Sequence, residues 1–167
     1  MSPRELRSRG LEGRVALITG AGGQIGRGIA RCLAEEGMKL ALADISHEAV
    51  KEGVREAKAM GSGGISFACD VTSEASCQAA VEQVCEELGG LHTLVNNAGV
   101  IGGPGFKLGP PLSDISEADW DATYNVNVKG VFFMCRSAIP VLKAQKAGRV
   151  INISSRAGRY ARPPIPH

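Results

Sequence analysis

The segment Arg14-Val-Ala-Leu-Ile-Thr-Gly-Ala-Gly-Gly-Gln-Ile-Gly26 decides the fold of this chain. Its first six residues form a short apolar run, which predicts a buried strand over residues 14–19. Glycines at positions 20, 23 and 26 follow at once. Residues 24–36 then carry apolar side chains at helical spacing until Gly37, which is expected to stop the helix. A strand, a glycine-rich turn and a helix in this order predict the first unit of a parallel α/β sheet.

The same alternation continues along the chain. Further apolar runs predict strands over residues 39–44, 65–69, 91–96 and 149–153, and amphipathic stretches predict helices over residues 47–60, 73–88 and 117–142. Pro140 is expected to disturb the last turn of the final helix, and residues 61–64 and 99–113 to form loops. Right-handed crossovers favour a doubly wound parallel sheet, a Rossmann fold with strand order 3-2-1-4-5. We expect a tail over residues 1–13 and one domain over residues 14–167.

The composition limits the classes of protein to which the chain can belong. The 167 residues carry a formal net charge of +2, with 44% hydrophobic and 22% charged residues. This is typical of a globular domain, and the small charge gives no reason to expect nucleic-acid binding. No apolar stretch approaches the roughly 20 residues of a membrane span. The five cysteines include no CxxC pair, and no His/Cys cluster has metal-ligand spacing, so we expect a cytoplasmic protein without a metal site.

The glycine-rich turn and two strand-end aspartates predict a site for an adenine dinucleotide. Glycines let a diphosphate approach the backbone, and the helix that begins at Gln24 offers free N–H groups and the positive end of its dipole. Asp44 ends the second strand, where a carboxylate can accept hydrogen bonds from both ribose hydroxyls and repels a 2′-phosphate, which favours NAD over NADP. Asp70 can accept from the adenine amino group while Val71 packs on the ring. A tight structural turn and a solvated strand-end aspartate are the alternatives.

Six motifs follow one another between Thr19 and Ser155: Thr19-Gly-x-x-Gly-x-x-Gly26, Asp44, Asp70-Val71, Asn96-Asn-Ala-Gly99, Asn127-x-x-Gly130 and Ile151-Asn-Ile-Ser-Ser155. In these motifs and their order the chain resembles the short-chain dehydrogenase/reductase family. The resemblance implies an NAD-dependent oxidoreductase that transfers hydride between nicotinamide and a secondary alcohol or its ketone. It implies that Ser155, rather than Ser154, hydrogen-bonds the substrate oxygen, and that Asn127, rather than Asn125, bends its helix and supports a proton-relaying water.

The expected cofactor contacts combine the glycine turn and strand ends with the positions that the resemblance adds. They are Gly20, Gly23, Gln24, Ile25, Gly26, Asp44, Asp70, Val71, Asn97, Ala98, Gly99 and Ile153. The resemblance also implies that the helix over residues 117–142 helps to build a homo-oligomer, a tetramer or a dimer, at full length.

Two features depart from the family pattern. The common branch of the family has glycine where this chain has Gln24, and the resulting glycine spacing is similar to that of the sugar-nucleotide epimerase branch. The family also uses a Tyr-x-x-x-Lys pair, in which the lysine lowers the tyrosine pKa. Neither Tyr124 nor Tyr160 has a lysine four residues later, and family spacing places the tyrosine just past His167. We therefore expect a chain truncated before this pair, with no turnover of its own.

Two other classes of function stay open from the sequence. A non-catalytic NAD-binding module or pseudoenzyme would explain why the Tyr-x-x-x-Lys pair is missing. An epimerase-like enzyme acting on nucleotide sugars would explain the spacing of Gly20, Gly23 and Gly26.

Overall fold

One parallel sheet organises the computed structural model, which describes residues 10–105 and 111–155. Its strands are β1 (Val15–Thr19), β2 (Lys39–Asp44), β3 (Gly64–Ala68), β4 (Thr93–Asn96) and β5 (Arg149–Asn152). They lie in the order β3-β2-β1-β4-β5, and every neighbouring pair is parallel. The predicted doubly wound sheet and its strand order are confirmed.

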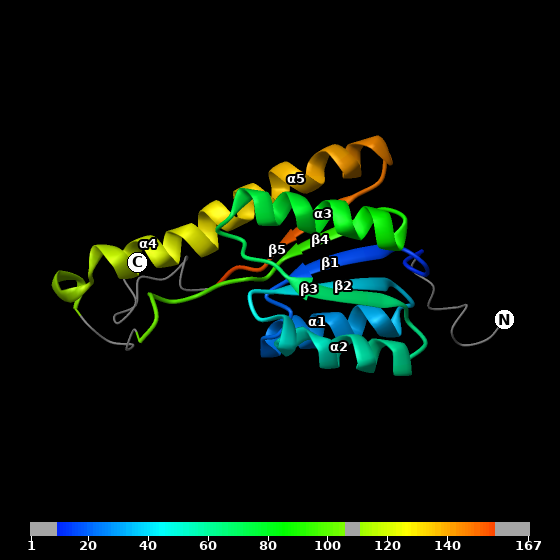
Figure 1. Ribbon diagram of the computed structural model, residues 1–167, viewed down its shortest axis with the longest axis horizontal. Helices are drawn as coiled ribbons and strands as arrows, with labels where there is room; N and C mark the ends of the chain where they lie inside the picture. Colours follow the sequence, from blue (N-terminus) through cyan, green and yellow to red (C-terminus); the bar gives the residue numbers. More distant parts are fainter. Residues whose placement is uncertain (1–9, 106–110, 156–167) are drawn as a thin grey trace.

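Helices cover both faces of the sheet (Figure 1). On one face lie α1 (Gln24–Glu35) and α2 (His47–Ala59), and on the other lie α3 (Glu74–Leu88) and α5 (Val131–Ala144). A short 3-10 turn, η2 (Leu112–Asp114), and α4 (Glu117–Tyr124) precede a π-helical segment, η3 (Asn125–Gly130), which runs directly into α5. The strands all end on the side from which α4 extends, so the loops that follow them gather at one edge.

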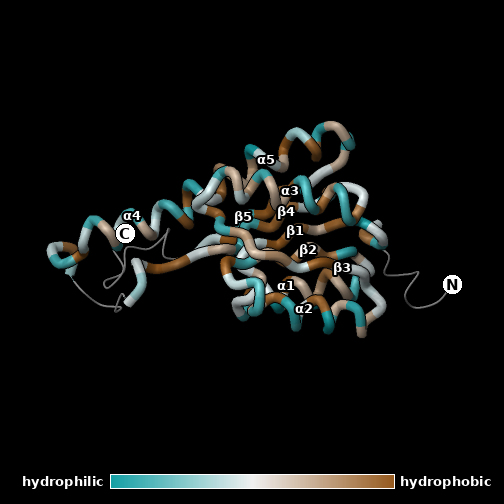
Figure 2. The backbone as a smooth tube through the Cα atoms, in the orientation of Figure 1, coloured by the Kyte–Doolittle hydropathy of each residue, from teal (hydrophilic) through white to brown (hydrophobic). Residues whose placement is uncertain are grey.

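Two apolar clusters hold the layers together, one on each side of the sheet. Successive strand residues point to opposite faces, so Leu17 joins the cluster under α3 and α5 whereas Ile18 joins the cluster under α1 and α2. Leu94 and Val95 of β4 divide in the same way. Figure 2 shows the apolar strands enclosed between helices of mixed polarity. Burial on both faces explains the continuous apolar sequences of the central strands β1, β2 and β4, whereas the edge strand β5 is exposed along its length.

The single helix predicted over residues 117–142 is wrong in two respects. A π-helical segment interrupts it at Asn125–Gly130, and the helix continues past Pro140 to Ala144. Pro140 lacks an N–H for the carbonyl four residues earlier and crowds that carbonyl, yet the helix ends two residues beyond the predicted end. Smaller differences concern strand ends: β3 begins at Gly64, one residue before the predicted start, and β4 begins at Thr93, two residues after it.

Residues 10–13, assigned to the tail, contact the domain. Leu11 packs against the cluster under α1 and α2, and the Gly13 N–H donates to the Gly37 carbonyl at 2.9 Å. Gly37 itself has a φ of +81°, as expected for the glycine that ends α1.

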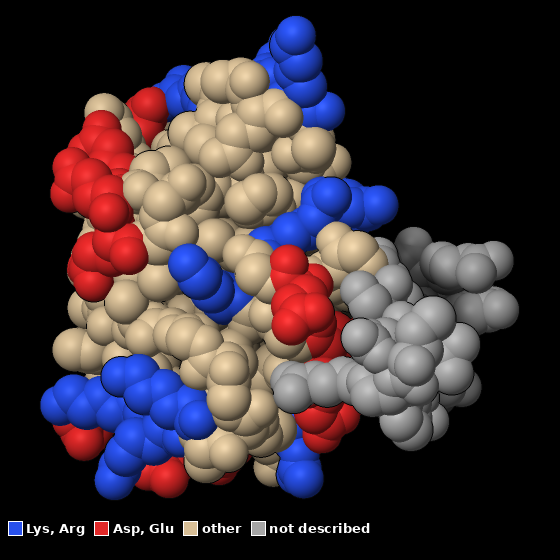
Figure 3. Space-filling model, turned by 90° about the vertical axis from the view of Figure 1, so that its right-hand side faces the viewer, with Lys and Arg blue, Asp and Glu red and all other residues tan. Residues whose placement is uncertain are grey.

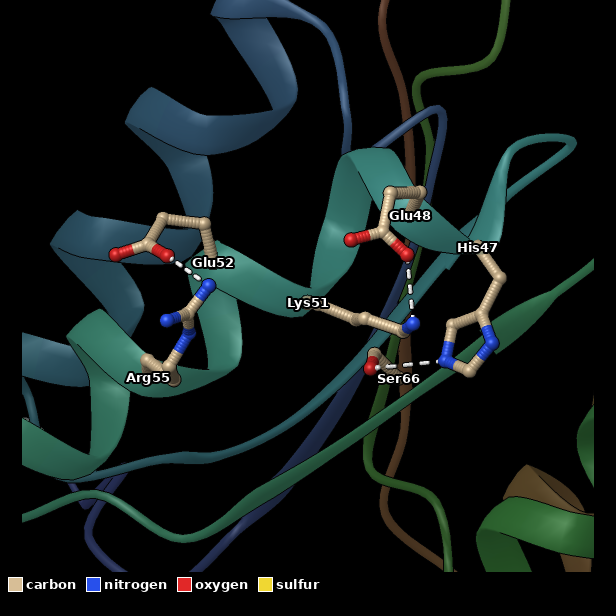
Figure 4. A network of polar contacts seen from close by, with 6 residues as sticks. All are labelled: His47, Glu48, Lys51, Glu52, Arg55 and Ser66. Carbon is tan, nitrogen blue, oxygen red and sulfur yellow. Dashed lines mark hydrogen bonds and ion pairs between the residues drawn. The ribbon is translucent and has the colours of Figure 1, made fainter.

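Charged side chains of both signs lie on the surface. On the face in Figure 3, Lys and Arg form separate groups beside groups of Asp and Glu. Along the outer face of α2, Glu48 pairs with Lys51 at 2.6 Å and Glu52 with Arg55 at 2.5 Å, while His47 meets Ser66 of β3 (Figure 4). Among the helices described, none is both long and apolar enough to cross a membrane.

Candidate active site

The turn between β1 and α1 and the first turn of α1 are packed so closely that one residue of each must be glycine. Gly20 has a φ of +61°, and a Cβ on it would lie 2.7 Å from the Ala98 Cα. A Cβ on Gly26 would lie 2.5 Å from the Gly20 carbonyl oxygen. Both obstacles are backbone atoms, which cannot move aside as a flexible side chain can. The glycines therefore let the turn fold back against the end of β4.

Hydrogen bonds from Thr19 and Asn97 lock this turn to the end of β4. The Thr19 Oγ1 accepts from the N–H groups of Asn97 and Ala98, each at 3.1 Å. The Asn97 Nδ2 donates to the Thr19 carbonyl at 3.0 Å and to the Gly20 carbonyl at 2.9 Å. The side-chain nitrogen of Asn97, a predicted cofactor contact, therefore holds the turn in place.

The N-terminus of α1 is suited to an anion. Its N-cap, Gly23, makes no side-chain capping bond, and its first turn contains no acidic residue. The N–H groups and positive dipole end of α1 therefore meet no competing anion of the helix itself. Gln24 is exposed at the first helical position, and Ile25 beside it is 64% exposed.

Asp44 lies at the end of β2 with its carboxylate held by two backbone donors. Gly22 N–H donates to Oδ2 at 3.0 Å and Ser46 N–H donates to Oδ1 at 3.1 Å. A carboxylate oxygen has two lone pairs, so each oxygen can still accept one further hydrogen bond. The group is fixed in direction and keeps capacity for two hydroxyl donors.

Asp70 and Val71 lie in the loop that joins β3 to α3. The Asp70 Oδ1 accepts from the N–H and the hydroxyl of Thr72, at 2.9 and 2.8 Å. Val71 is buried, and it fills the space beside Gly130, where a Cβ would lie 2.8 Å from its Cγ2. Two buried thiols frame this loop: a hydrogen bond from Cys77 lowers the pKa of Cys69, and the same bond raises the pKa of Cys77.

Asn127 ties the π-helical segment to the loop after β4. Its Nδ2 donates to the Val100 carbonyl at 2.8 Å, and its Oδ1 accepts from the Val100 N–H at 2.9 Å. A π segment is a common cause of a helix bend, and it leaves backbone groups out of regular helical register. The bend expected at Asn127 therefore coincides with the π-helical segment. Among the residues that the structure describes, the side chain of Asn125 has no hydrogen-bond partner.

A cleft of about 920 Å³ opens where β1, β4 and β5 end. Asn96 fixes one wall of it: its Nδ2 donates to the Asn152 Oδ1 at 2.8 Å, and its carbonyl accepts from the Ile153 N–H at 2.9 Å. These bonds place the segment from Ile153 to Ser155 at the cleft. The predicted site residues that line it are Ile25, Asn97, Ala98, Gly99, Asn127, Ile153 and Ser155.

The other predicted residues lie around the cleft rather than in its lining. Around Ile25, the turn and helix start include Gly20, Gly23, Gln24 and Gly26. Asp44 ends β2, and Asp70 and Val71 follow β3. Along the described ranges, no group of three His, Cys, Asp or Glu side chains is placed to hold a metal ion.

Comparison with known proteins decides the family. Residues 14–167 match the family model of the short chain dehydrogenases. The chain belongs to the short-chain dehydrogenase/reductase family. Over 153 residues this short-chain dehydrogenase/reductase is 36% identical to 3-oxoacyl-[acyl-carrier-protein] reductase FabG of Thermotoga maritima, covering 92% of the chain and 60% of the relative.

Solved structures agree with this assignment. The short-chain dehydrogenase/reductase superimposes on an NAD+-bound xylitol dehydrogenase with a TM-score of 0.87 at 34% identity, covering 93% of the chain and 58% of that structure. It superimposes on a metagenomic short-chain oxidoreductase in complex with NADP with a TM-score of 0.83 at 37% identity, covering 91% and 66%. The chain spans little more than half the length of most of these relatives.

One exposed apolar residue beside the site of this short-chain dehydrogenase/reductase has no prediction from the sequence. It is Ile45, which directly follows Asp44 and is 75% exposed. Asn96 belongs to the Asn-Asn-Ala-Gly motif that carries the family resemblance, and its side chain joins β4 to β5 at the cleft. Its partner, Asn152, lies far along the chain, so the sequence does not show which residue it meets.

Proposed function

We propose that this protein is an NAD-dependent oxidoreductase that interconverts a secondary alcohol and its ketone. The observation that carries the proposal is the meeting of Ile25, Asn127 and Ser155, from three separate elements, in one cleft beside the N-terminus of α1. Clefts beyond the carboxyl ends of parallel strands are where such sheets bind ligands. Family membership and the oxidoreductase relatives support the reaction class.

The residues present fit a nicotinamide dinucleotide. The uncapped start of α1 and its glycine turn suit the diphosphate, and Asp44 can accept from the hydroxyls of the adenosine ribose. The neighbouring structures hold NAD in one case and NADP in another, so the choice between them rests on Asp44. A carboxylate at that position favours the free 2′-hydroxyl of NAD and repels a phosphate.

The chain's own groups would position the reacting atoms. The nicotinamide ring supplies or accepts the hydride when the cofactor is bound. The Ser155 hydroxyl would donate to the substrate oxygen, and Asn127, through its place in the π-helical segment, would help to order a water for proton transfer. The proton-transferring residue itself is expected from a Tyr-x-x-x-Lys pair, which these 167 residues do not contain.

Cofactor choice is testable by calorimetric titration with NADH and NADPH. We expect NADH to bind more tightly, and Asp44→Asn to weaken NADH binding by about tenfold, since a charged hydrogen-bond acceptor is lost. Asp121→Asn, an equal charge change on the exposed surface of α4, should leave both affinities unchanged. A wild-type preference for NADPH would refute the role given to Asp44.

Catalysis is testable by comparing two adjacent serines in a polypeptide that includes a Tyr-x-x-x-Lys. Ser155→Ala should lower kcat for NAD-dependent alcohol oxidation by about a hundredfold, because a donor to the reacting oxygen is removed. Ser154→Ala, which also lines the cleft, is the matched control and should keep most of the activity. Equal losses in the two variants would contradict the assignment of Ser155.

We also propose a homo-oligomer and a cytoplasmic location. Trp120, Tyr124, Val128 and Phe132 recur every fourth residue along α4 and its continuation, and all are exposed. Such an apolar stripe suits the same stripe of a second copy, as the family resemblance implies. All five cysteines are free thiols, which suits a reducing compartment.

A further inference from the structure

Arg27 bridges two elements that flank the proposed ribose site. It lies in the first turn of α1 with an exposed side chain. Its Nε donates to the Gly22 carbonyl at 3.1 Å and its Nη2 donates to the Ala49 carbonyl at 3.2 Å. One guanidinium therefore joins the glycine turn to the first turn of α2, and its rigid planar fork suits this double contact.

Gly22 is the residue on which these contacts converge. On one side its N–H donates to the Asp44 carboxylate, and on the other its carbonyl accepts from Arg27. A Cβ on Gly22 would lie 2.6 Å from the Ala49 Cβ and 3.0 Å from the Asp44 Oδ2. The turn, Asp44 and the start of α2 thus meet within contact distance around one glycine.

Backbone hydrogen bonds hold the neighbours of Gly22, since the Ala21 N–H donates to the Ala43 carbonyl at 3.1 Å and the Gly23 N–H to the Gly20 carbonyl at 3.2 Å. The N–H and carbonyl of Gly22 itself bond to the side chains of Asp44 and Arg27. Gly22 and Gly23 are consecutive glycines, and glycine has more conformational freedom to lose than any other residue. The Gly22 N–H is one of only two backbone donors that the structure gives to the Asp44 carboxylate, the other being Ser46. If the Gly22 peptide units turn, the carboxylate loses a donor and with it part of its fixed direction.

We propose that Arg27 is a positioning residue that holds Gly22 against Asp44 and so sets the affinity for the adenosine ribose. The inference rests on the proposed function, because it takes Asp44 as the acceptor for the ribose hydroxyls. Arg27 need not touch the dinucleotide. It acts through the Gly22 peptide, which keeps the carboxylate aimed while both of its oxygens retain a free lone pair.

The first experiment needs no cofactor. Hydrogen exchange of the Gly22 amide is measured by NMR in wild type, Arg27→Met, Arg27→Lys and Arg31→Met. Arg31, one turn further along α1, pairs only with Glu35 in the described structure and is the matched control. We expect faster Gly22 exchange in Arg27→Met, partial recovery in Arg27→Lys, and wild-type exchange in Arg31→Met. Equal Gly22 exchange in all four proteins would overturn the inference.

The second experiment measures NADH affinity by calorimetry in two backgrounds. Arg27→Met should raise the Kd for NADH about fivefold when Asp44 is present, the effect of one weakened hydrogen-bonded contact. In the Asp44→Asn background the same change should have less than about a twofold effect, because the group that Arg27 positions is already altered. A purely structural role would give equal losses in both backgrounds and would overturn the inference while the proposed function stands. Wild-type protein that does not bind NADH at all would overturn both.

Discussion

Gly26 and Gly28 lie two residues apart on α1 in opposite surroundings. A Cβ on Gly26 would strike the Gly20 carbonyl and the Ala21 Cα, whereas a Cβ on Gly28 would meet nothing within 4 Å. Gly26→Ala should therefore destabilise the fold by about 2 kcal/mol through overpacking. Gly28→Ala should stabilise it by about 0.5 kcal/mol, because alanine loses less backbone freedom in a helix.

Urea unfolding of both variants measures the two effects. Opposite shifts of the unfolding midpoint are expected from the same chemical change in the same helix. Similar shifts in the two variants would mean that the packing of the turn is looser than these contacts indicate.

Among single residues, the sequence predicts the roles that depend on neighbours in the chain. It does not predict roles that depend on contacts with residues far along the chain. The glycines of the turn and Asp44 are readable because a strand, a turn and a helix surround them. Arg27 carries no signal, since its partners are carbonyl oxygens of Gly22 and Ala49 that any residue type would provide. Val71 was expected against an adenine ring, and its fit against Gly130 depends on a helix far along the chain.

Asn127, between α4 and α5, holds the start of the loop after β4, while Thr123 and Asp119 of α4 accept from Gly102 and Gly103 further along the loop. Asn127 makes both of its side-chain hydrogen bonds to the backbone of Val100, so Asn127→Ala should cost about 1–2 kcal/mol in unfolding free energy. Hydrogen exchange of the Val100 amide should also become faster. Asn125→Ala, in the same π-helical segment, should change neither quantity. A Val100 amide that exchanges alike in both variants would show that the loop is held elsewhere.

Elements whose burial is uniform were predicted well, and elements that change environment along their length were not. The central strands β1, β2 and β4 are buried, and apolar runs give the positions of all five strands to within about two residues, although β5 is exposed along its length. The helical segment from Glu117 onward is mostly exposed in α4 and packs on the sheet in α5. The spacing of its apolar residues does not show where the π-helical geometry begins. Family resemblance indicated a bend at Asn127, which periodicity alone did not.

The order of the strands brings the site together at the scale of the whole molecule. The chain runs from β1 outward through β2 to β3, then crosses back through α3 to β4 on the other side of β1 and continues outward to β5. The direction in which strands are added therefore reverses beside β1. That reversal opens the crevice between the ends of β1 and β4 where the cleft lies. The topology followed from the alternation of strands and helices, and the site position followed from the topology.

The exposed apolar stripe of α4, η3 and α5, formed by Trp120, Tyr124, Val128 and Phe132, is where we expect a second copy of the chain to bind. Phe132 is 53% exposed on this stripe, so Phe132→Glu should leave folding nearly unchanged. If the stripe pairs with a second copy, burying a glutamate there should raise the dissociation constant of the oligomer by about a hundredfold. Ala79→Glu, an equal charge change at an exposed position of α3, should leave assembly intact. Sedimentation velocity over a range of concentrations separates these outcomes, and identical sedimentation of Phe132→Glu and wild type would place the interface elsewhere.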